Sequence, residues 1–300
     1  MRAVWSFWTK PIRDHGLVGW IDTKHHLFSW VLSVETARRH YPETSLITDD
    51  DGARMLIDRL GLPFENVSTA LSTLESHNSQ WYAMGKLYAY AMQTEPFVHI
   101  DGDVYLWNQL PERMERADVL AQNPEFFNFG ASYYRPDALE RALAKNGHGW
   151  IPEEWRWFRS SGLPQKAESC GIIGGTRIDF FNYYAKLAIK LIEHPSNRLA
   201  WSHLESYAER MLLAEQYLLS ACIEYHKRRK DSAFKGINAE YLFDSLSDAF
   251  RPDKAERAGF THLIAGAKSD RAIAARLEIR VKRDYPHHYE RCLKYISEIK

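Results

Sequence analysis

Cysteine is scarce in this 300-residue sequence, and the three that it has, Cys170, Cys222 and Cys292, lie far apart. No Cys-Xaa-Xaa-Cys spacing occurs, which argues against both a zinc knuckle and a framework of paired disulfides. An odd number of dispersed cysteines is typical of proteins that stay in a reducing compartment. The cysteine content therefore predicts an intracellular protein.

Net charge and long apolar runs are lacking as well. Lys plus Arg and Asp plus Glu both total 39, so the formal net charge is zero. A protein that binds nucleic acid through a broad basic surface would need an excess of positive charge. No stretch approaches the roughly 18 to 20 apolar residues of a membrane span, and the N-terminal apolar run is too short for a signal peptide. We expect a cytoplasmic protein with no transmembrane segment and no nucleic-acid partner.

The sequence is rich in apolar residues, at 45%, and in aromatic residues, at 13%, which is enough for a full core. Strand-like and helix-like patterns alternate from the start, with strands over residues 3–8 and 45–51 and helices over 25–39 and 52–60. This alternation predicts an α/β fold with a parallel sheet and crossover helices. Neither an internal repeat nor a low-complexity linker interrupts it, so we expect a single domain over residues 1–300.

The later part of the chain continues the pattern with one interruption. Further helices are expected over residues 81–93, 178–194 and 202–225, with a strand over 169–176. Residues 110–166 are only weakly periodic; they are either an insertion that shapes an acceptor pocket or an irregular surface subdomain packed by its tryptophans. Residues 269–300 are charged and helical in pattern, and we expect them to form a tail on the outside.

The stretch from Pro96 to Trp107 contains the most informative motif. The apolar run from Phe97 to Ile100 predicts a buried strand, and Asp101-Gly102-Asp103 follows it directly. Two carboxylates at a strand end are costly to bury unless a cation accompanies them, and a hard ion such as Mg²⁺ or Mn²⁺ prefers oxygen ligands. The glycine allows backbone and ligand to approach closely. The alternative is a solvated turn with local hydrogen bonds from the aspartates.

A second stretch, from Gly259 to Lys268, offers complementary groups. His262 ends a short apolar run, and Gly266 and Lys268 follow within one loop. The imidazole is a candidate third metal ligand, and Lys268 is a candidate phosphate contact. Lys86, on the helix before the central strand, is another candidate for phosphate. Each of these residues also has an ordinary structural or solvated interpretation.

Taken in order, these motifs resemble a metal-dependent glycosyltransferase of the GT-A fold, closest to the retaining enzymes of family 8. The family's Asp-Xaa-Asp run corresponds to Asp101-Gly102-Asp103, and its cation on the preceding helix to Lys86. Its Asn-Ala-Gly-Val strand is similar to Ser169–Ile172, its later Asp-Gln pair to Glu215-Gln216, and its closing His-Xaa-Xaa-Gly-Xaa-Xaa-Lys element to His262–Lys268. The resemblance extends from residue 3 to about residue 270.

The sequence departs from the family pattern at four points. Gly266 is the fourth residue after His262 rather than the third, and no Pro-Trp follows Lys268. Glu215 stands where the family has aspartate, and Ser169 stands where it has asparagine.

The resemblance implies a Rossmann-like, mixed but mainly parallel sheet flanked by helices, and a metal-dependent, retaining hexosyltransferase. Its donor would be a nucleotide-sugar, specifically a UDP-sugar, and its acceptor an unidentified glycan, lipid or protein. It implies a Mn²⁺ or Mg²⁺ ion held by Asp101, Asp103 and His262. It further implies a donor-binding set and a pair near the reacting face of the sugar: Thr9, Lys10, Asp49, Asp50, Lys86, Gly171, Gly266 and Lys268 for the donor, and Gln216 with Glu215 for the sugar.

Two other interpretations remain open at the level of sequence. A haloacid-dehalogenase-type phosphatase also uses an apolar strand followed by Asp-Xaa-Asp, but that motif normally opens its domain. The second is a non-catalytic relative that binds a nucleotide-sugar without turnover, which the altered glycine spacing after His262 would permit.

Overall fold

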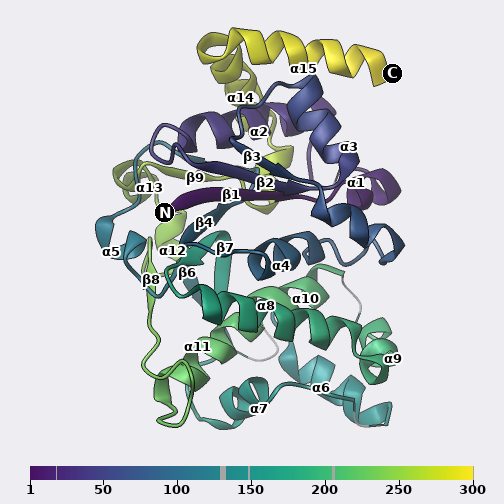
Figure 1. The fold of residues 1–300 in the computed structure, drawn as a ribbon, viewed down its shortest axis with the longest axis vertical. Coiled ribbons are helices and arrows are strands. Elements are labelled where there is room, and N and C mark those ends of the chain that lie inside the picture. The colour runs from purple at the N-terminus through teal and green to yellow at the C-terminus, as the bar shows by residue number, and fades with distance from the viewer. Residues whose placement is uncertain (18, 129–132, 148, 205–206, 300) are drawn as a thin grey trace. The chain divides into compact units, whose positions relative to one another are not determined.

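A computed structural model describes residues 1–17, 19–128, 133–147, 149–204 and 207–299 (Figure 1). The chain divides into two compact units. Unit 1 contains residues 1–79, 97–110 and 252–300, and unit 2 contains residues 80–96 and 111–251. Each unit is therefore assembled from segments that are far apart in the sequence.

The strands of unit 1 form a parallel arrangement centred on β1 (Arg2–Phe7). β1 pairs with β2 (Thr44–Thr48) on one side and with β4 (Phe97–Ile100) on the other, and β3 (Asn66–Ser68) pairs with β2. The chain moves from β1 to β2 and β3 in one direction, and β4 then adds on the opposite side of β1. In open α/β sheets, ligands bind beyond the carboxyl ends of the strands at such a reversal. The loops after β1 and β4 are therefore the expected place for a site.

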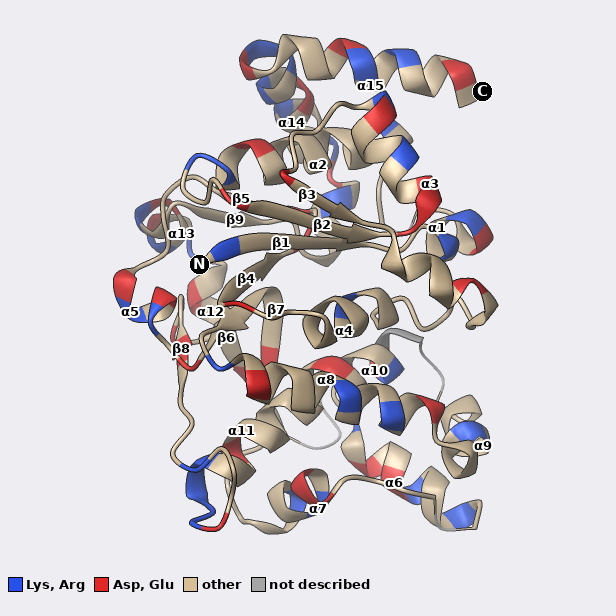
Figure 2. Ribbon diagram, in the orientation of Figure 1, with Lys and Arg blue, Asp and Glu red and all other residues tan. Residues whose placement is uncertain are grey.

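Helix α2 (Thr23–Ala37) is the central helix of unit 1. Its N-terminus is capped by Asp22, whose side chain accepts a hydrogen bond from the backbone of Lys24. From Leu27 onward it is buried, because β5, α14 and α15 pack against it. Figure 1 shows α14 and α15 beyond α2, and Figure 2 shows charges of both signs along these two helices. The helical segments of unit 1 also include α1 (Lys10–His15), α3 (Asp50–Ala53), the π-helical turn η1 (Arg54–Arg59), η2 (Ala70–Ser76), α13 (Pro252–Ala258), η5 (Ala265–Ser269), α14 (Arg271–Asp284) and α15 (Pro286–Ile299).

A two-stranded antiparallel ribbon completes unit 1. It consists of β5 (Val104–Leu106), which follows the Asp-Gly-Asp segment, and β9 (Phe260–His262), which comes more than 150 residues later in the sequence. Val104 lies opposite His262 in this pairing. The ribbon therefore brings the two informative sequence stretches together.

Unit 2 has its own strands and helices. β6 (Val119–Phe126) pairs antiparallel with β7 (Lys166–Gly175) and parallel with β8 (Ala239–Tyr241). Among the described residues of unit 2, the helical segments are α4 (Met84–Ala91), α5 (Glu112–Glu115), α6 (Pro136–Lys145), α7 (Glu153–Ser160), α8 (Ile178–Glu193), η3 (Pro195–Asn197), α9 (Arg198–Ser202), α10 (Tyr207–Leu212), the π-helical turn η4 (Leu213–Tyr217), α11 (Leu218–Arg228) and α12 (Leu246–Ala249).

The expected fold class, α/β with a mixed and mainly parallel sheet flanked by helices, is confirmed at that level. One of the two alternatives for residues 110–166, an irregular subdomain, was wrong, because this range contains α5, β6, α6 and α7; residues 129–132 and 148 lie outside the described part. The helix expected over 202–225 is confirmed from Tyr207 onward, where α10, η4 and α11 follow one another without a break. Its π-helical turn was not predicted, and residues 205–206 are not described. Among the described residues, no helix has the length and apolar character needed to cross a membrane.

Candidate metal centre

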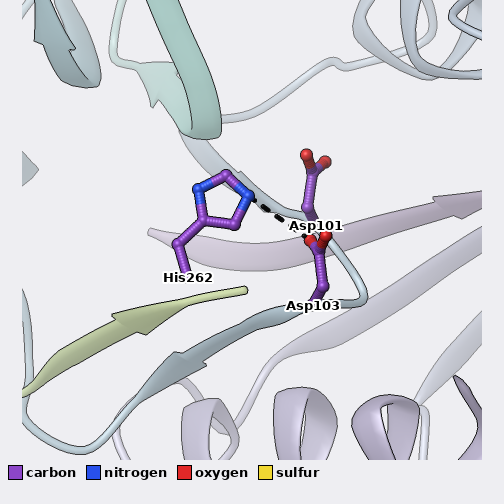
Figure 3. A group of neighbouring side chains, drawn as sticks. All are labelled: Asp101, Asp103 and His262. Carbon is purple, nitrogen blue, oxygen red and sulfur yellow. Dashed lines mark ion pairs between the residues drawn. The ribbon is translucent and has the colours of Figure 1, made fainter. Parts of the chain in front are cut away.

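Three potential ligands converge in unit 1 (Figure 3). Asp101 follows β4, Asp103 precedes β5, and His262 ends β9. Each offers one ligand atom, and these atoms all lie within 4.8 Å of one another. The β5–β9 pairing explains the geometry, because it fixes His262 opposite Val104, the residue after Asp103. The structure thus brings together the three residues that the sequence suggested as metal ligands.

The backbone of the Asp-Gly-Asp segment is held in place by α2. Ser33 Oγ donates a hydrogen bond to the carbonyl of Asp101 at 2.9 Å, and Ser29 Oγ donates one to the carbonyl of Gly102 at 2.8 Å. A Cβ atom on Gly102 would lie 2.7 Å from Cε2 of Trp30, too close for any real contact. Glycine is required here by the close approach of the Trp30 indole, and the two serines fix the carbonyls on that side of the turn.

Charged and imidazole groups surround the two carboxylates. Nε2 of His262 lies 3.5 Å from Oδ1 of Asp103, and Nζ of Lys268 lies 2.5 Å from its Oδ2. On the other side, Nδ1 of the buried His99 lies 3.7 Å from Oδ1 of Asp101, and Ser6 Oγ is 2.8 Å from the other ring nitrogen of His99. The Asp103 side chain is only 12% exposed. Negative charge is therefore concentrated at a partly buried position that favours a cation.

This donor set fits a divalent cation. Oxygen ligands bind Mg²⁺ or Ca²⁺ at about 2.0 to 2.6 Å, so atoms on opposite sides of one ion are about 4 to 5 Å apart. The 4.8 Å limit on the three ligand atoms agrees with that spacing. Two carboxylates would neutralise the charge of the ion, and a mixed oxygen and imidazole set suits Mn²⁺ or Mg²⁺ better than thiol-preferring metals.

Thr9 and Asp49 connect the carboxyl ends of β1 and β2. The backbone N and Oγ1 of Thr9 both donate to Oδ2 of Asp49, at 2.7 and 2.8 Å. The other carboxylate oxygen of Asp49 accepts from the backbone of Gly52 at 2.8 Å and so caps α3. Lys10 and Asp50 do not join this pair: Lys10 Nζ contacts the carbonyl of Glu75, and the side chain of Asp50 is exposed.

Unit 1 also contains a cavity of about 540 Å³, whose lining does not include the candidate ligands but does include residues close to Lys268. Trp20 and His26 are among its lining residues, and Nζ of Lys268 lies 5.7 Å from the Trp20 ring centroid. Desolvation and, to a lesser extent, the charge of Lys268 lower the pKa of His26 to about 4, although the charge of Asp103 opposes the decrease. The neutral ring accepts a hydrogen bond from Trp30 Nε1 at 3.2 Å. Sequence reasoning did not single out Trp20 or His26, because neither lies in a recognisable motif.

Four further candidates, Lys86, Gly171, Glu215 and Gln216, lie in unit 2, and two of them form an ion pair. Nζ of Lys86 lies 2.9 Å from Oε1 of Glu215 and donates to the carbonyl of Cys170 at 3.3 Å. Tyr90 also donates to Oε1 of Glu215, at 3.1 Å. Gly171 follows Cys170 in the buried strand β7. Lys86, Glu215 and the backbone beside Gly171 thus form one cluster, whereas Gly266 lies in unit 1, in η5, with open space around it.

Gln216 belongs to a second polar group of unit 2. The hydroxyl of Tyr134 lies 2.6 Å from Oε1 of Gln216 and 2.8 Å from Oε2 of Glu125. Burial raises the pKa of Glu125, hydrogen bonds with Tyr134 and Ser169 oppose this, and the charge of Glu168 raises it further. A carboxyl group with a raised pKa is a candidate for proton transfer. Glu125 was missed at the sequence level because β6 was not predicted.

A family model matches residues 1–295, nearly the whole chain. The chain belongs to DUF6734, a family of unknown function. The matched region of this DUF6734 chain includes Asp101, Asp103 and His262. A comparison with curated proteins finds no match.

Proposed function

We propose that this DUF6734 protein is a metal-dependent glycosyltransferase that moves a sugar from a UDP-sugar to an acceptor. The observation that supports this most is the convergence of Asp101, Asp103 and His262 beyond the carboxyl end of β4, at the reversal of strand order. A metal at that position beside Lys268 would face an anionic ligand. A nucleoside diphosphate is the kind of ligand that such a pair of cations recognises.

Different residues of the chain would hold the metal ion and contact the diphosphate. A bound Mn²⁺ or Mg²⁺ ion would supply Lewis-acid stabilisation of negative charge on the leaving diphosphate. Asp101, Asp103 and His262 would hold that ion. Lys268 pairs with Asp103 in the structure. If a metal ion bound the Asp103 carboxylate instead, the ammonium group of Lys268 would be available to bind a phosphate oxygen. Fixed positive groups at developing charge give the largest catalytic benefit.

The cavity of about 540 Å³ is a suitable place for the nucleoside. Its size falls within the range of about 300 to 1,000 Å³ that is usual for small-molecule sites. Trp20 offers an aromatic face near Lys268, and Leu27 and Met55 add apolar surface. His26 would present an uncharged ring there, because its pKa is lowered to about 4.

The resemblance to family 8 assigns Lys86 to the diphosphate and Glu215 with Gln216 to the sugar, and these assignments are part of the proposal. Lys86 and Glu215 already contact each other in unit 2, and Gln216 is held by Tyr134. Retention of configuration at the sugar is proposed from the resemblance alone.

One observation favours a second candidate, a nucleotide-sugar-binding protein without turnover. The ammonium group of Lys268 lies within ion-pair distance of a carboxylate oxygen that a metal would use. If this pair persists when the donor is bound, the protein could bind the donor through Lys268 and lack the Lewis acid.

Calorimetric titration of UDP with and without Mn²⁺ distinguishes these functions. For the transferase, we expect UDP to bind tightly only when Mn²⁺ is present. Asp103→Asn should abolish this Mn²⁺-dependent binding, whereas the matched surface variant Asp58→Asn should bind UDP as the wild type does. A donor screen for sugar release or transfer then follows. Equal UDP binding without metal would favour the binding protein. No binding under any condition would refute both, and phosphatase substrates would be tested next.

A further inference from the structure

A second cavity, of about 370 Å³, lies on the opposite face of the β5–β9 ribbon from the candidate ligands. Its lining includes Tyr105 and Trp107 from the β5 segment and Thr261 and Leu263 from the β9 segment. Neighbouring residues of a strand point to opposite faces. His262 lies between Thr261 and Leu263 and therefore points away from this cavity, toward Asp103.

The floor of the cavity is apolar. Leu32 from α2 and Leu277 from α14 line it together with Tyr105 and Leu263, and all four side chains are buried. The Tyr105 hydroxyl is 2.9 Å from Ser29 Oγ, so its polar end is already satisfied within the protein. The floor therefore presents hydrocarbon and aromatic surface, which favours an apolar ligand body.

The rim of the cavity carries two positive charges. Arg276 and Arg280 both line it and are one helical turn apart on α14, on the same face of the helix. The guanidinium of Arg280 lies 4.5 Å from the centroid of the Trp107 ring and is also paired with Asp284. None of the described lining residues is acidic. An arginine held on an aromatic ring is oriented before any ligand arrives.

We propose that this cavity binds a small amphiphilic anion, a compact apolar body with a single carboxylate or phosphate head. The apolar body would pack on Leu32, Tyr105 and Leu277, and the head would lie at Arg276 and Arg280. Planar guanidinium groups pair with carboxylate and phosphate oxygens in bidentate geometry, which supplies the preference for an anionic head. The volume lies within the usual range for small-molecule sites.

This proposal does not depend on the proposed transferase function. Its residues are distinct from the candidate metal ligands and from the lining of the larger cavity. Experiments can therefore be performed in EDTA, which removes divalent ions and prevents the candidate metal centre from recruiting a phosphate group.

Calorimetry with four probes tests the proposal: octanoate, octyl phosphate, octanol and inorganic phosphate, all in EDTA and below any micelle concentration. We expect saturable 1:1 binding of octanoate, octyl phosphate or both, with octanol and inorganic phosphate at least about tenfold weaker. A preference between the first two identifies the head group. If octanol bound as tightly as the anionic octyl probes, the site would be a purely apolar groove. If inorganic phosphate bound as tightly as they do, it would be a simple anion site. Either result, or the absence of saturable binding by any probe, would overturn the proposal.

Two variants locate the binding. The double variant Arg276→Gln with Arg280→Gln should weaken the anionic probes at least about tenfold, whereas Lys282→Gln, which removes an exposed charge from the same helix, should not. Ile273→Trp, which places a large ring at a lining position, should reduce binding of every probe. Unchanged binding in both the double arginine variant and the Ile273 variant would place the ligand elsewhere and refute the assignment.

Discussion

The ammonium nitrogen of Lys268 lies 2.5 Å from Oδ2 of Asp103, whose other carboxylate oxygen faces His262 at 3.5 Å. One carboxylate therefore contacts both a proposed metal ligand and a cation that competes with the metal. The first prediction concerns this competition. Lys268→Met should raise the affinity for Mn²⁺ in the absence of nucleotide about fivefold, the effect of removing an ion pair worth about 1 kcal/mol.

The same variant should lower the affinity for UDP in the presence of Mn²⁺, because a phosphate contact is lost. Lys282→Met, an exposed lysine of α14, serves as the control and should change neither value. A fall in Mn²⁺ affinity on removing Lys268 would show that this lysine does not compete for the carboxylate.

Gly102 provides the second prediction. A Cβ atom at this position would lie 2.7 Å from the buried Trp30 ring, so Gly102→Ala must displace the ring or the turn. We expect a loss of about 1 to 3 kcal/mol in the free energy of unfolding, as for other overpacked sites, and a tenfold or greater loss of Mn²⁺ affinity. Gly266→Ala, at a glycine where an added Cβ atom would meet nothing within 4 Å, should be nearly neutral in stability. Equal effects of the two substitutions would contradict the close packing of Trp30 on Gly102 as the cause.

Ser33 provides the third prediction. It accepts a hydrogen bond from Nε1 of the fully buried Trp5 at 2.9 Å and donates one to the carbonyl of Asp101 at 2.9 Å. Ser33→Ala would leave the Trp5 N–H buried without a partner, which costs about 1 to 3 kcal/mol. Urea unfolding should show this loss, while Ser297→Ala on the exposed face of α15 should stay within about 0.5 kcal/mol of wild type.

The fourth prediction concerns the contact between α15 and α2. Nε2 of His288 lies 3.4 Å from Oε1 of the buried Glu35, and this interaction raises the pKa of His288 above its ordinary 6.5, although burial opposes the increase. Burial alone would raise the pKa of Glu35, but hydrogen bonds with His288 and Arg38 outweigh it and lower this pKa below its ordinary 4.5. The charged pair therefore forms over a defined range of pH.

The sign of each shift fixes that range. The contribution of His288 to the free energy of unfolding is complete below pH 6.5 and is lost as the pH rises through its raised pKa. The contribution of Glu35 is complete above pH 4.5 and is lost as the pH falls through its lowered pKa. The pair should stabilise the protein most between these two values. His288→Gln should cost about 1.5 to 3 kcal/mol near pH 6 and less at pH 9, and the exposed neighbour His287→Gln should show no such difference. Denaturant midpoints at the two pH values measure it.

The candidate ligands could be predicted from sequence because their signals are local. An apolar strand followed by Asp101-Gly102-Asp103 is a continuous pattern, and His262 also ends a short apolar run. The pairing of β5 with β9, which places His262 opposite Val104, could not be predicted from either segment alone. The structural roles of Ser33 and Trp30 were also missed, because they depend on how α2 approaches the turn.

Strand β6 and the π-helical turn η4 could not be predicted from the sequence, and in both cases the reason is physical. β6 contains the sequence Gln122-Asn123-Pro124, which reads as a polar break, yet Gln122 and Asn123 are fully buried in the strand. The π-helical turn η4 adds one residue to the helical repeat at Glu215 and Gln216, and a regular apolar period cannot show such an insertion. Both cases are ones in which tertiary packing overrides the local pattern.

The central claim, that Asp101, Asp103 and His262 form a metal site, is tested most directly by Mn²⁺ titration monitored by electron paramagnetic resonance. We expect one tightly bound ion per chain, and at least tenfold weaker binding for Asp101→Asn, Asp103→Asn and His262→Gln. The surface variant Asp58→Asn should bind Mn²⁺ as wild type does. Absence of binding by the wild type, or binding that survives all three substitutions, would contradict the metal site and the function proposed from it.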